Sequence, residues 1–110
     1  MTSAYKVIWA NVAENDLKNI IAYIAEDSPQ NSLTIINQIR EKASHLYALP
    51  ERGRIVPELQ GQGIVHYREL IISPWRLIYR IDERNVYVLS VFDSRQNVED
   101  ILLKRFINKT

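Results

Sequence analysis

Hydrophobic and polar residues alternate most regularly between His66 and Arg95, where three successive runs have the period of two that is typical of β-strands. In the run from Trp75 to Asp82, one set of alternate positions is apolar, whereas the other set contains Arg76 and Arg80. This pattern predicts a strand with one apolar face and one cationic face.

The neighbouring runs predict two further strands. Residues 66–72 alternate in the same way, and Ser73-Pro74 predicts a turn before the next strand, because proline has no backbone N–H to donate to a sheet. The run from Val86 to Phe92 is almost wholly apolar, which is typical of a central strand covered on both faces.

Two amphipathic helices are predicted in the first half of the chain. The apolar face of the first helix consists of Ala13, Leu17, Ile20, Ile21 and Ile24. The corresponding stripe of the second helix consists of Leu33, Ile36, Ile39, Ala43 and Leu46. Asn11 and Glu14 have the spacing of a capping box, and Ser28-Pro29 provides an N-cap and a first helical residue for the second helix. Because the connection is short, we expect an antiparallel helical hairpin.

The remaining segments complete an α+β domain. Residues 4–10 alternate as a short first strand, and the region from Glu51 to Gly63 holds all three glycines and is predicted to be a loop. A last helix is expected from Val98 to about Ile107, with Asn97 as its N-cap. The sequence therefore predicts one domain, residues 1–110, with an N-terminal strand, a two-helix hairpin, a three-stranded antiparallel sheet and a C-terminal helix.

The composition is that of an ordinary globular domain, with 46% hydrophobic and 25% charged residues. The absence of cysteine excludes disulfides, thiolate catalysis and cysteine-ligated zinc. Neither His45 nor His66 has a second ligand at a metal-binding spacing, so we expect no metal and no other cofactor. No apolar run approaches the roughly 18 residues that span a bilayer, and the N-terminus lacks a secretory signal, which together predict a cytoplasmic protein without membrane contact.

Arginine is concentrated in one region, although the net charge of the chain is only +1. The stretch from residue 51 to residue 95 contains seven arginines and no lysine. The planar guanidinium suits contacts with phosphate, carboxylate and aromatic groups. We therefore predict a partner-binding cationic surface formed by Arg68, Arg76, Arg80 and Arg95. The alternative for each is a structural ion pair, with Glu58, Glu69 or Asp82 for the first three and with Asp93 or Asp100 for Arg95.

Five short motifs follow one another along the chain. They are Asp16–Ile24 (DLKNIIAYI), Leu49–Leu59 (LPERGRIVPEL), Tyr67–Ile72 (YRELII), Trp75–Asp82 (WRLIYRID) and Val86–Gln96 (VYVLSVFDSRQ). In order and spacing, these motifs resemble the RelE/ParE superfamily of bacterial type II toxins. The resemblance implies a small toxin neutralised by a cognate protein antitoxin that binds over its surface. RelE-like members cleave messenger RNA on the ribosome, whereas ParE-like members bind and poison DNA gyrase.

The resemblance also suggests roles for residues of a ribonuclease site. RNA cleavage without a metal needs a base, cations around the phosphate and an acid for the leaving oxygen. In the branch that looks like the YoeB toxin, Glu58 would match the base, Arg76 the phosphate clamp and Arg68 a further arginine. The acid, a histidine or tyrosine, has no match, because Phe92-Asp93-Ser94 stands there and an aspartate is ionised at pH 7.

The missing acid favours the ParE interpretation, which needs no catalytic acid. We therefore expect the toxin component of a type II toxin–antitoxin system that inhibits DNA gyrase as a protein ligand and not as an enzyme. The alternative is a RelE-like, metal-independent mRNA endoribonuclease, with the ribosome and messenger RNA as its partners.

Overall fold

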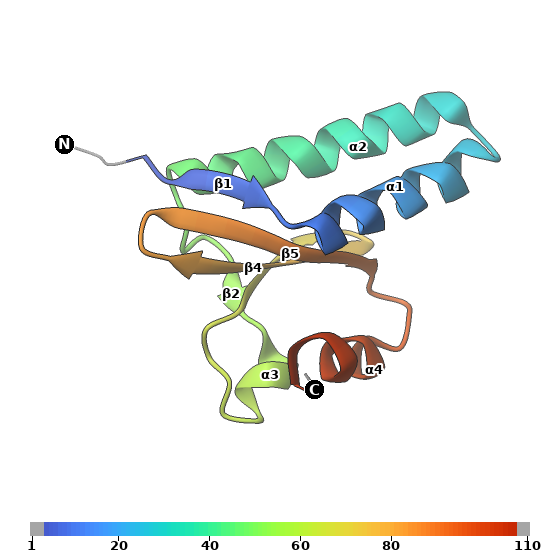
Figure 1. The fold of residues 1–110 in the computed structure, drawn as a ribbon. Helices are drawn as coiled ribbons and strands as arrows, with labels where there is room; N and C mark the ends of the chain where they lie inside the picture. Colours follow the sequence, from blue (N-terminus) through green and yellow to red (C-terminus); the bar gives the residue numbers. More distant parts are fainter. Residues whose placement is uncertain (1–3, 108–110) are drawn as a thin grey trace.

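The computed structural model describes residues 4–107, which form one sheet with helices on both faces (Figure 1). The strands are β1 (Lys6–Trp9), β2 (Arg54–Ile55), β3 (Arg68–Ile72), β4 (Trp75–Asp82) and β5 (Asn85–Asp93). The helices are α1 (Asn11–Ala25), α2 (Pro29–Ser44), α3 (Pro57–Gln60) and α4 (Val98–Leu102). A 3₁₀ turn (His45–Tyr47) follows α2, and a π-helical stretch (Leu103–Ile107) continues α4. We call α4 and this stretch together the C-terminal helix.

The strands lie side by side in the order β1-β5-β4-β3-β2. The three strands predicted from alternation, β3, β4 and β5, pair in antiparallel fashion, and Ser73-Pro74 joins the first two as expected. The sheet is nevertheless larger than the predicted three strands. β2 pairs with β3, and β1 pairs in parallel with β5, with Lys6 opposite Asn85. The described sheet is therefore mixed, and its one parallel pair joins the first strand to the last strand.

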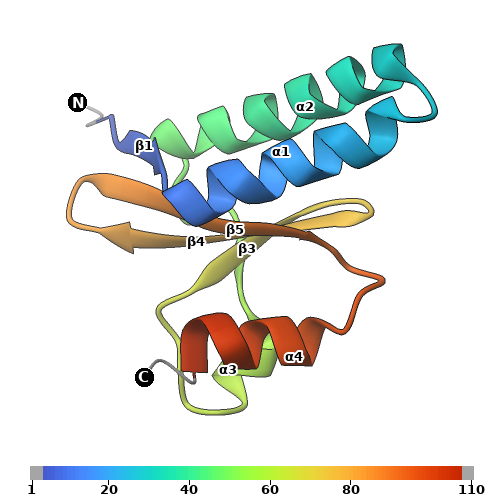
Figure 2. The ribbon, with the colours of Figure 1, turned by 45° about the vertical axis from the view of Figure 1, so that its right-hand side comes forward.

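The sheet separates two hydrophobic cores (Figure 2). The hairpin of α1 and α2 covers one face, and its core includes Leu17, Ile39, Leu46, Leu77, Tyr79 and Val88. On the opposite face, α3 and the C-terminal helix cover a smaller core of Val56, Leu59, Tyr67, Ile78, Phe92 and Leu102. The prediction that the third run forms a central strand covered on both faces is confirmed, because β5 contributes side chains to both cores.

Two of the three predicted helix caps are confirmed. The Ser28 side chain accepts a hydrogen bond from the Asn31 N–H, with Pro29 as the first residue of α2. The Asn97 side chain likewise accepts from the Asp100 N–H. The predicted capping box of Asn11 and Glu14 is wrong, because α1 begins one residue earlier than it requires, with Ala10 as the N-cap residue.

The buried stripes of the hairpin also differ in detail from the prediction. Glu14 binds Arg40 of α2 instead of capping α1, and this ion pair ties the two helices together. Leu33, which was placed on the apolar stripe of α2, is 63% exposed, because it lies near the free end of the hairpin. None of the helices within residues 4–107 is long and apolar enough to span a membrane.

The predicted loop from Glu51 to Gly63 contains both β2 and α3. The buried Tyr79 hydroxyl fixes the start of this region, since it donates to the Pro50 carbonyl at 2.7 Å and accepts from the Gly53 N–H at 2.9 Å. These bonds hold the segment against the sheet and place α3, with Glu58, beneath β4.

Candidate functional site

The predicted arginines do not share one surface. Arg68 lies opposite Tyr79 on the face of the sheet that the hairpin covers, and its Nη1 donates to the Gly53 carbonyl at 2.7 Å. Arg76 and Arg80 lie on the other face, about 13 Å apart along β4 at 3.3 Å per residue. The expected convergence of these three side chains is therefore wrong, because neighbouring strands set Arg68 and Arg76 on opposite faces.

Arg76 is instead the centre of a group of four charges, two of them buried, which we call the charge cluster. It consists of Arg54, Glu58, Glu69 and Arg76. The Arg76 side chain is only 8% exposed and Glu69 is fully buried, and the Arg76 Nε donates to Glu69 at 2.7 Å. The two terminal nitrogens of Arg76 donate to the two oxygens of Glu58 at 2.9 and 2.8 Å. Arg54 adds a bond from its Nε to Glu69 at 2.6 Å, so both carboxylates are paired.

The charge cluster changes the chemistry of Glu58. Its hydrogen bonds with Arg76 hold the pKa of the Glu58 carboxyl below its ordinary value, and the same bonds raise the pKa of Arg76. A carboxylate with a lowered pKa and both oxygens engaged is a weak base. Glu58 and Arg76 lie together, as the resemblance to ribonuclease toxins implies, but they neutralise each other.

Asp93, at the position where an acid is expected, forms an ion pair with Arg95. The Arg95 Nε donates to Asp93 at 2.9 Å, and the Arg95 backbone N–H donates to the same carboxylate oxygen at 2.8 Å. The hydrogen bonds from Arg95 lower the pKa of Asp93. Asp93 is therefore held in the ionised form and has no proton to give at neutral pH.

Arg80 differs from the other predicted arginines. Its side chain is exposed, and it forms no hydrogen bond or ion pair with another residue of the described range 4–107. A role in binding a partner stays a prediction for Arg68, Arg76, Arg80 and Arg95. Of these four, only Arg80 could bind a partner without giving up a contact to another described residue.

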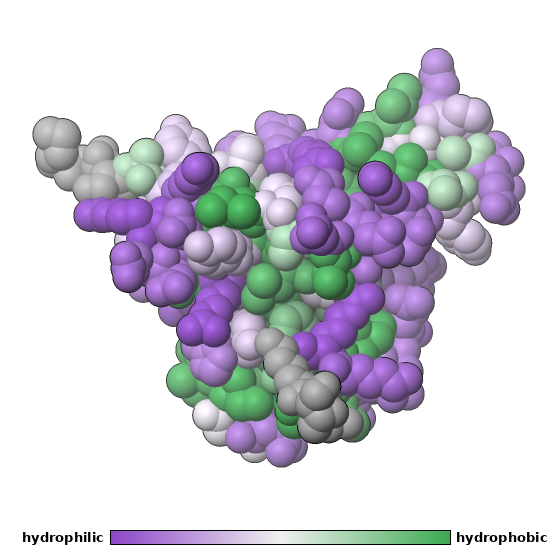
Figure 3. Space-filling view, viewed as in Figure 1, coloured by the Kyte–Doolittle hydropathy of each residue, from purple (hydrophilic) through white to green (hydrophobic). Residues whose placement is uncertain are grey.

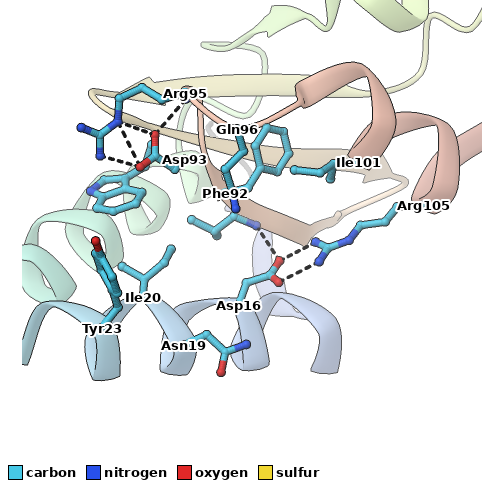
Figure 4. A pocket seen from close by; sticks show the side chains of 12 residues that line it. Asp16, Asn19, Ile20, Tyr23, Phe92, Asp93, Arg95, Gln96, Ile101 and Arg105 are labelled. Atoms are coloured by element: carbon cyan, nitrogen blue, oxygen red, sulfur yellow. Dashed lines mark hydrogen bonds and ion pairs between the residues drawn. The ribbon is translucent and has the colours of Figure 1, made fainter. Parts of the chain in front are cut away.

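A hollow of the described surface lies elsewhere, along the edge of β5. β1 ends at Trp9, opposite Val88, so the rest of β5 has no strand beside it on that edge. A cavity of about 540 Å³ lies here between α1 and the C-terminal helix (Figure 4). Its apolar lining includes Ile20, Tyr23, Trp75, Phe92 and Ile101. A second cavity of about 350 Å³, lined by Val12, Leu89 and Phe106 among others, continues along the same edge.

We call these two cavities together the β5 groove. Figure 3 shows hydrophobic side chains in the middle of one face of the molecule, between the hairpin and the C-terminal helix, with hydrophilic side chains around them. Arg105 lines both cavities and lies between them. Tyr23 is 75% exposed on the rim. A groove with large apolar side chains, beside a strand edge that has no neighbouring strand, is the kind of surface that receives an extended or helical segment of a partner protein.

Asp16 closes the strand edge inside the β5 groove. Its carboxylate accepts from the Val91 N–H at 2.9 Å, from the Ser90 hydroxyl at 3.3 Å and from Arg105 Nη1 at 2.7 Å. Figure 4 shows Asp16 and Arg105 facing each other across the strand, with the Asp93–Arg95 pair farther along. α1, β5 and the C-terminal helix therefore meet at one carboxylate.

Sequence reasoning did not single out Asp16, Ser90 or Arg105, although a signal for two of them exists. Asp16 falls between Ala13 and Leu17 on the apolar side of a predicted helix, and Ser90 is the one polar residue in an otherwise apolar strand run. Polar residues in such positions need partners when they are buried. Within residues 4–107 no three His, Asp or Glu side chains are grouped so that they could hold a metal ion.

One protein-family model matches most of the chain. Residues 7–98 match the model of the ParE toxin of the type II toxin–antitoxin system parDE. The chain is 26% identical over 101 residues to Toxin ParE3 of Caulobacter vibrioides, covering 91% of this chain and 97% of that protein. Two solved structures have similar folds. The first is a chromosomal ParDE toxin–antitoxin system from P. aeruginosa, with a TM-score of 0.66, 19% identity and coverage of 84% of this chain and 98% of that chain. The second is the toxin–antitoxin complex RelBE2 from Mycobacterium tuberculosis, with a TM-score of 0.56, 20% identity and coverage of 84% and 94%.

Proposed function

The chain belongs to the ParE toxin family of type II toxin–antitoxin systems, and we propose that it inhibits DNA gyrase in the cytoplasm and is neutralised by a cognate protein antitoxin. The observation that carries this proposal is the match to the ParE family model over residues 7–98. In the superfamily, poisoning of gyrase is the activity of the ParE branch. The RelE alternative is not favoured, since the family model and the curated relative are both ParE toxins.

The geometry of the charge cluster supports the same choice. A ribonuclease of the kind described above needs a free base and a protonated acid on either side of a phosphate. Here Glu58 is bound by both terminal nitrogens of Arg76, and Asp93 is kept ionised by Arg95. An inhibitor that acts by binding a protein target needs neither group.

We assign the antitoxin to the β5 groove. Two features of a peptide-binding surface are present there, a hollow with large apolar side chains and a strand edge without a neighbouring strand. Tyr23 on the rim would contribute a large aromatic contact of the kind that dominates protein interfaces. Similar solved structures are themselves toxin–antitoxin systems.

The decisive experiment is a gyrase supercoiling assay with the antitoxin-free protein, beside a ribosome-dependent messenger cleavage assay. Loss of supercoiling with trapped, cleaved DNA and intact messenger is the expected result. Cut messenger with undisturbed supercoiling would overturn the proposal and return Glu58 and Arg76 to catalytic roles.

The antitoxin site is tested separately with Tyr23→Asp. Burying an unpaired charge on the rim of the groove should weaken antitoxin binding at least tenfold, as measured by titration calorimetry. Leu33→Asp is the matched control, because Leu33 is similarly exposed but lies on α2 and does not line the β5 groove. Equal affinities of the two variants would place the antitoxin elsewhere, without bearing on the gyrase result.

A further inference from the structure

The Arg76 guanidinium binds an internal carboxylate in the geometry that it would use for an external anion. Its Nη1 and Nη2 atoms donate to separate oxygens of Glu58, at 2.9 and 2.8 Å. Two parallel N–H···O bonds of this kind are equally suited to two oxygens of a phosphate. The third contact, from Nε to the buried Glu69, fixes the plane of the guanidinium against the sheet. Arg76 is therefore a preorganised anion-binding group.

A second guanidinium lies beside the same carboxylate. Arg54 uses its Nε to bind Glu69, and its terminal nitrogens bind no other residue within the described range. Arg54 and Arg76 bind different oxygens of Glu69, Oε2 and Oε1, so one buried carboxylate holds both guanidinium groups close together. Glu58 thus binds the terminal nitrogens of one of two arginines that have a common, buried support in Glu69.

The four charges of the cluster sum to zero only because Glu58 is present. Glu69 is fully buried and bound by both arginines, whereas Glu58 is 32% exposed and belongs to the four-residue helix α3 at the surface. Without Glu58, the site would hold two guanidinium groups and one carboxylate, and Glu69 would be the shared acidic partner of both arginines. The positive charge that is then left over would favour an oxyanion from solution in the place of the Glu58 carboxylate.

We propose that Arg54 and Arg76 form a phosphate-binding site and that Glu58 occupies it in this chain, which excludes phosphate groups, both free and in nucleic acid. Glu58 is on this view an internal competitor, and it determines that this surface does not bind phosphate. The inference does not depend on which target the toxin inhibits.

The test replaces Glu58 by alanine and compares melting temperatures in phosphate and in chloride at equal ionic strength and pH. We expect a saturable rise in the melting temperature of Glu58→Ala, about 5 °C when phosphate exceeds its dissociation constant tenfold. The wild type should show no such rise. Glu14→Ala is the matched control, because it removes an acid from another Glu–Arg pair, with Arg40, outside the cluster. Equal phosphate effects on all three proteins would overturn the proposal.

Further variants separate the site from general effects of folding. Should Glu58→Ala fail to melt cooperatively, Glu58→Gln keeps the size of the side chain and removes its charge, and it should show a smaller rise of the same kind. Adding Arg54→Ala should abolish the rise in either background, and a rise that persists would refute the role of Arg54.

A fluorescent single-stranded RNA tests whether the site also binds the phosphate groups of nucleic acid. Glu58→Ala should bind this RNA at least tenfold more tightly than Glu14→Ala, and inorganic phosphate should compete with the RNA. Equal RNA affinities, together with a phosphate-dependent melting temperature, would restrict the site to free phosphate and refute the extension to nucleic acid.

Discussion

Asp16 in α1 and Arg105 in the C-terminal helix are 89 residues apart in the chain, and 2.7 Å separates their Oδ2 and Nη1 atoms. The pair crosses the unpaired edge of β5, and the same Asp16 oxygen accepts the Val91 N–H. One carboxylate therefore satisfies a strand edge and attaches the helix that covers the second core. The Asp16 side chain is 9% exposed and that of Arg105 is 36% exposed, so we do not expect the two residues to contribute equally to the free energy of unfolding.

Asp16→Ala should destabilise the protein more than Arg105→Ala. Loss of the carboxylate leaves the Val91 N–H unpaired and the Arg105 guanidinium without its acidic partner, and we expect a cost of about 2–4 kcal/mol. Arg105→Ala leaves Asp16 bound to the strand and should cost about 1 kcal/mol. Urea denaturation of both variants measures these values, and a larger effect of Arg105→Ala would contradict the assignment of Asp16 as the central acceptor.

Gly53→Ala should be destabilising because the backbone there approaches its neighbours too closely for a side chain. An added Cβ would lie 2.4 Å from the Glu69 carbonyl oxygen and 2.7 Å from the Tyr79 hydroxyl. We expect a loss of about 1–3 kcal/mol from this overpacking. Gly61→Ala is the control, since its Cβ would meet nothing closer than 3.6 Å. Thermal melts in which both variants behave alike would contradict the close packing at Gly53.

Tyr79→Phe should lower stability although it removes a single oxygen. The hydroxyl is buried, and its loss leaves the Pro50 carbonyl and the Gly53 N–H without their partner, at a cost of about 1–3 kcal/mol. Tyr23→Phe removes an exposed hydroxyl and should change the unfolding free energy by less than about 0.5 kcal/mol. Similar denaturant midpoints for the two variants would argue against this contact.

Arg76→Ala should strongly destabilise the folded protein, whereas Arg80→Ala should leave its stability almost unchanged. Removal of Arg76 leaves the fully buried Glu69 with a single cationic partner, Arg54, and should destabilise the protein by about 3–5 kcal/mol. Arg80→Ala removes an exposed side chain and should stay within about 0.5 kcal/mol of the wild type. Arg80→Ala is therefore the suitable variant for a toxicity assay, whereas lost toxicity of Arg76→Ala would report lost structure.

Acid should remove the contribution of Glu58 to stability. Because the pKa of Glu58 is lowered in the folded state, chiefly by its hydrogen bonds with Arg76, this contribution is complete above the unfolded pKa of roughly 4.3 and is lost as the pH falls through the folded value. Glu58→Gln has no proton to take up at this position. The difference in melting temperature between the wild type and Glu58→Gln should therefore be largest at pH 7 and shrink below about pH 4. A constant difference from pH 7 to pH 3 would contradict the lowered pKa.

Elements with a local signal were predictable from the sequence. β4 has the bounds that its alternation indicates, Trp75–Asp82, and α2 begins at the predicted Ser28-Pro29 cap. The parallel pairing of β1 with β5 has no such signal, because it depends on how the hairpin packs on the sheet. The four residues of β1 fit the pattern of a strand, but nothing in them specifies the neighbouring strand.

The site was predictable only as a set of residue types. The sequence indicated Glu58, Arg76 and their possible pairing, but alternation alone could not show that Arg68 faces the hairpin while Arg76 faces α3. It also could not show that the buried Glu69 binds two arginines. One of them, Arg54, belongs to β2, and β2 lies in a region that the sequence predicts to be a loop. Long-range pairs such as Asp16 and Arg105 arise from the packing of three separate elements.

The pairing of β1 with β5 has a consequence for the biosynthesis of the toxin. β1 is translated early, but the strand beside which it must lie begins at Asn85. At roughly 5–20 residues per second, a ribosome needs several seconds to make the intervening chain. During this interval the nascent polypeptide has its hairpin but no edge on which β1 can pair, so the folded toxin arises only after most of its message has been read.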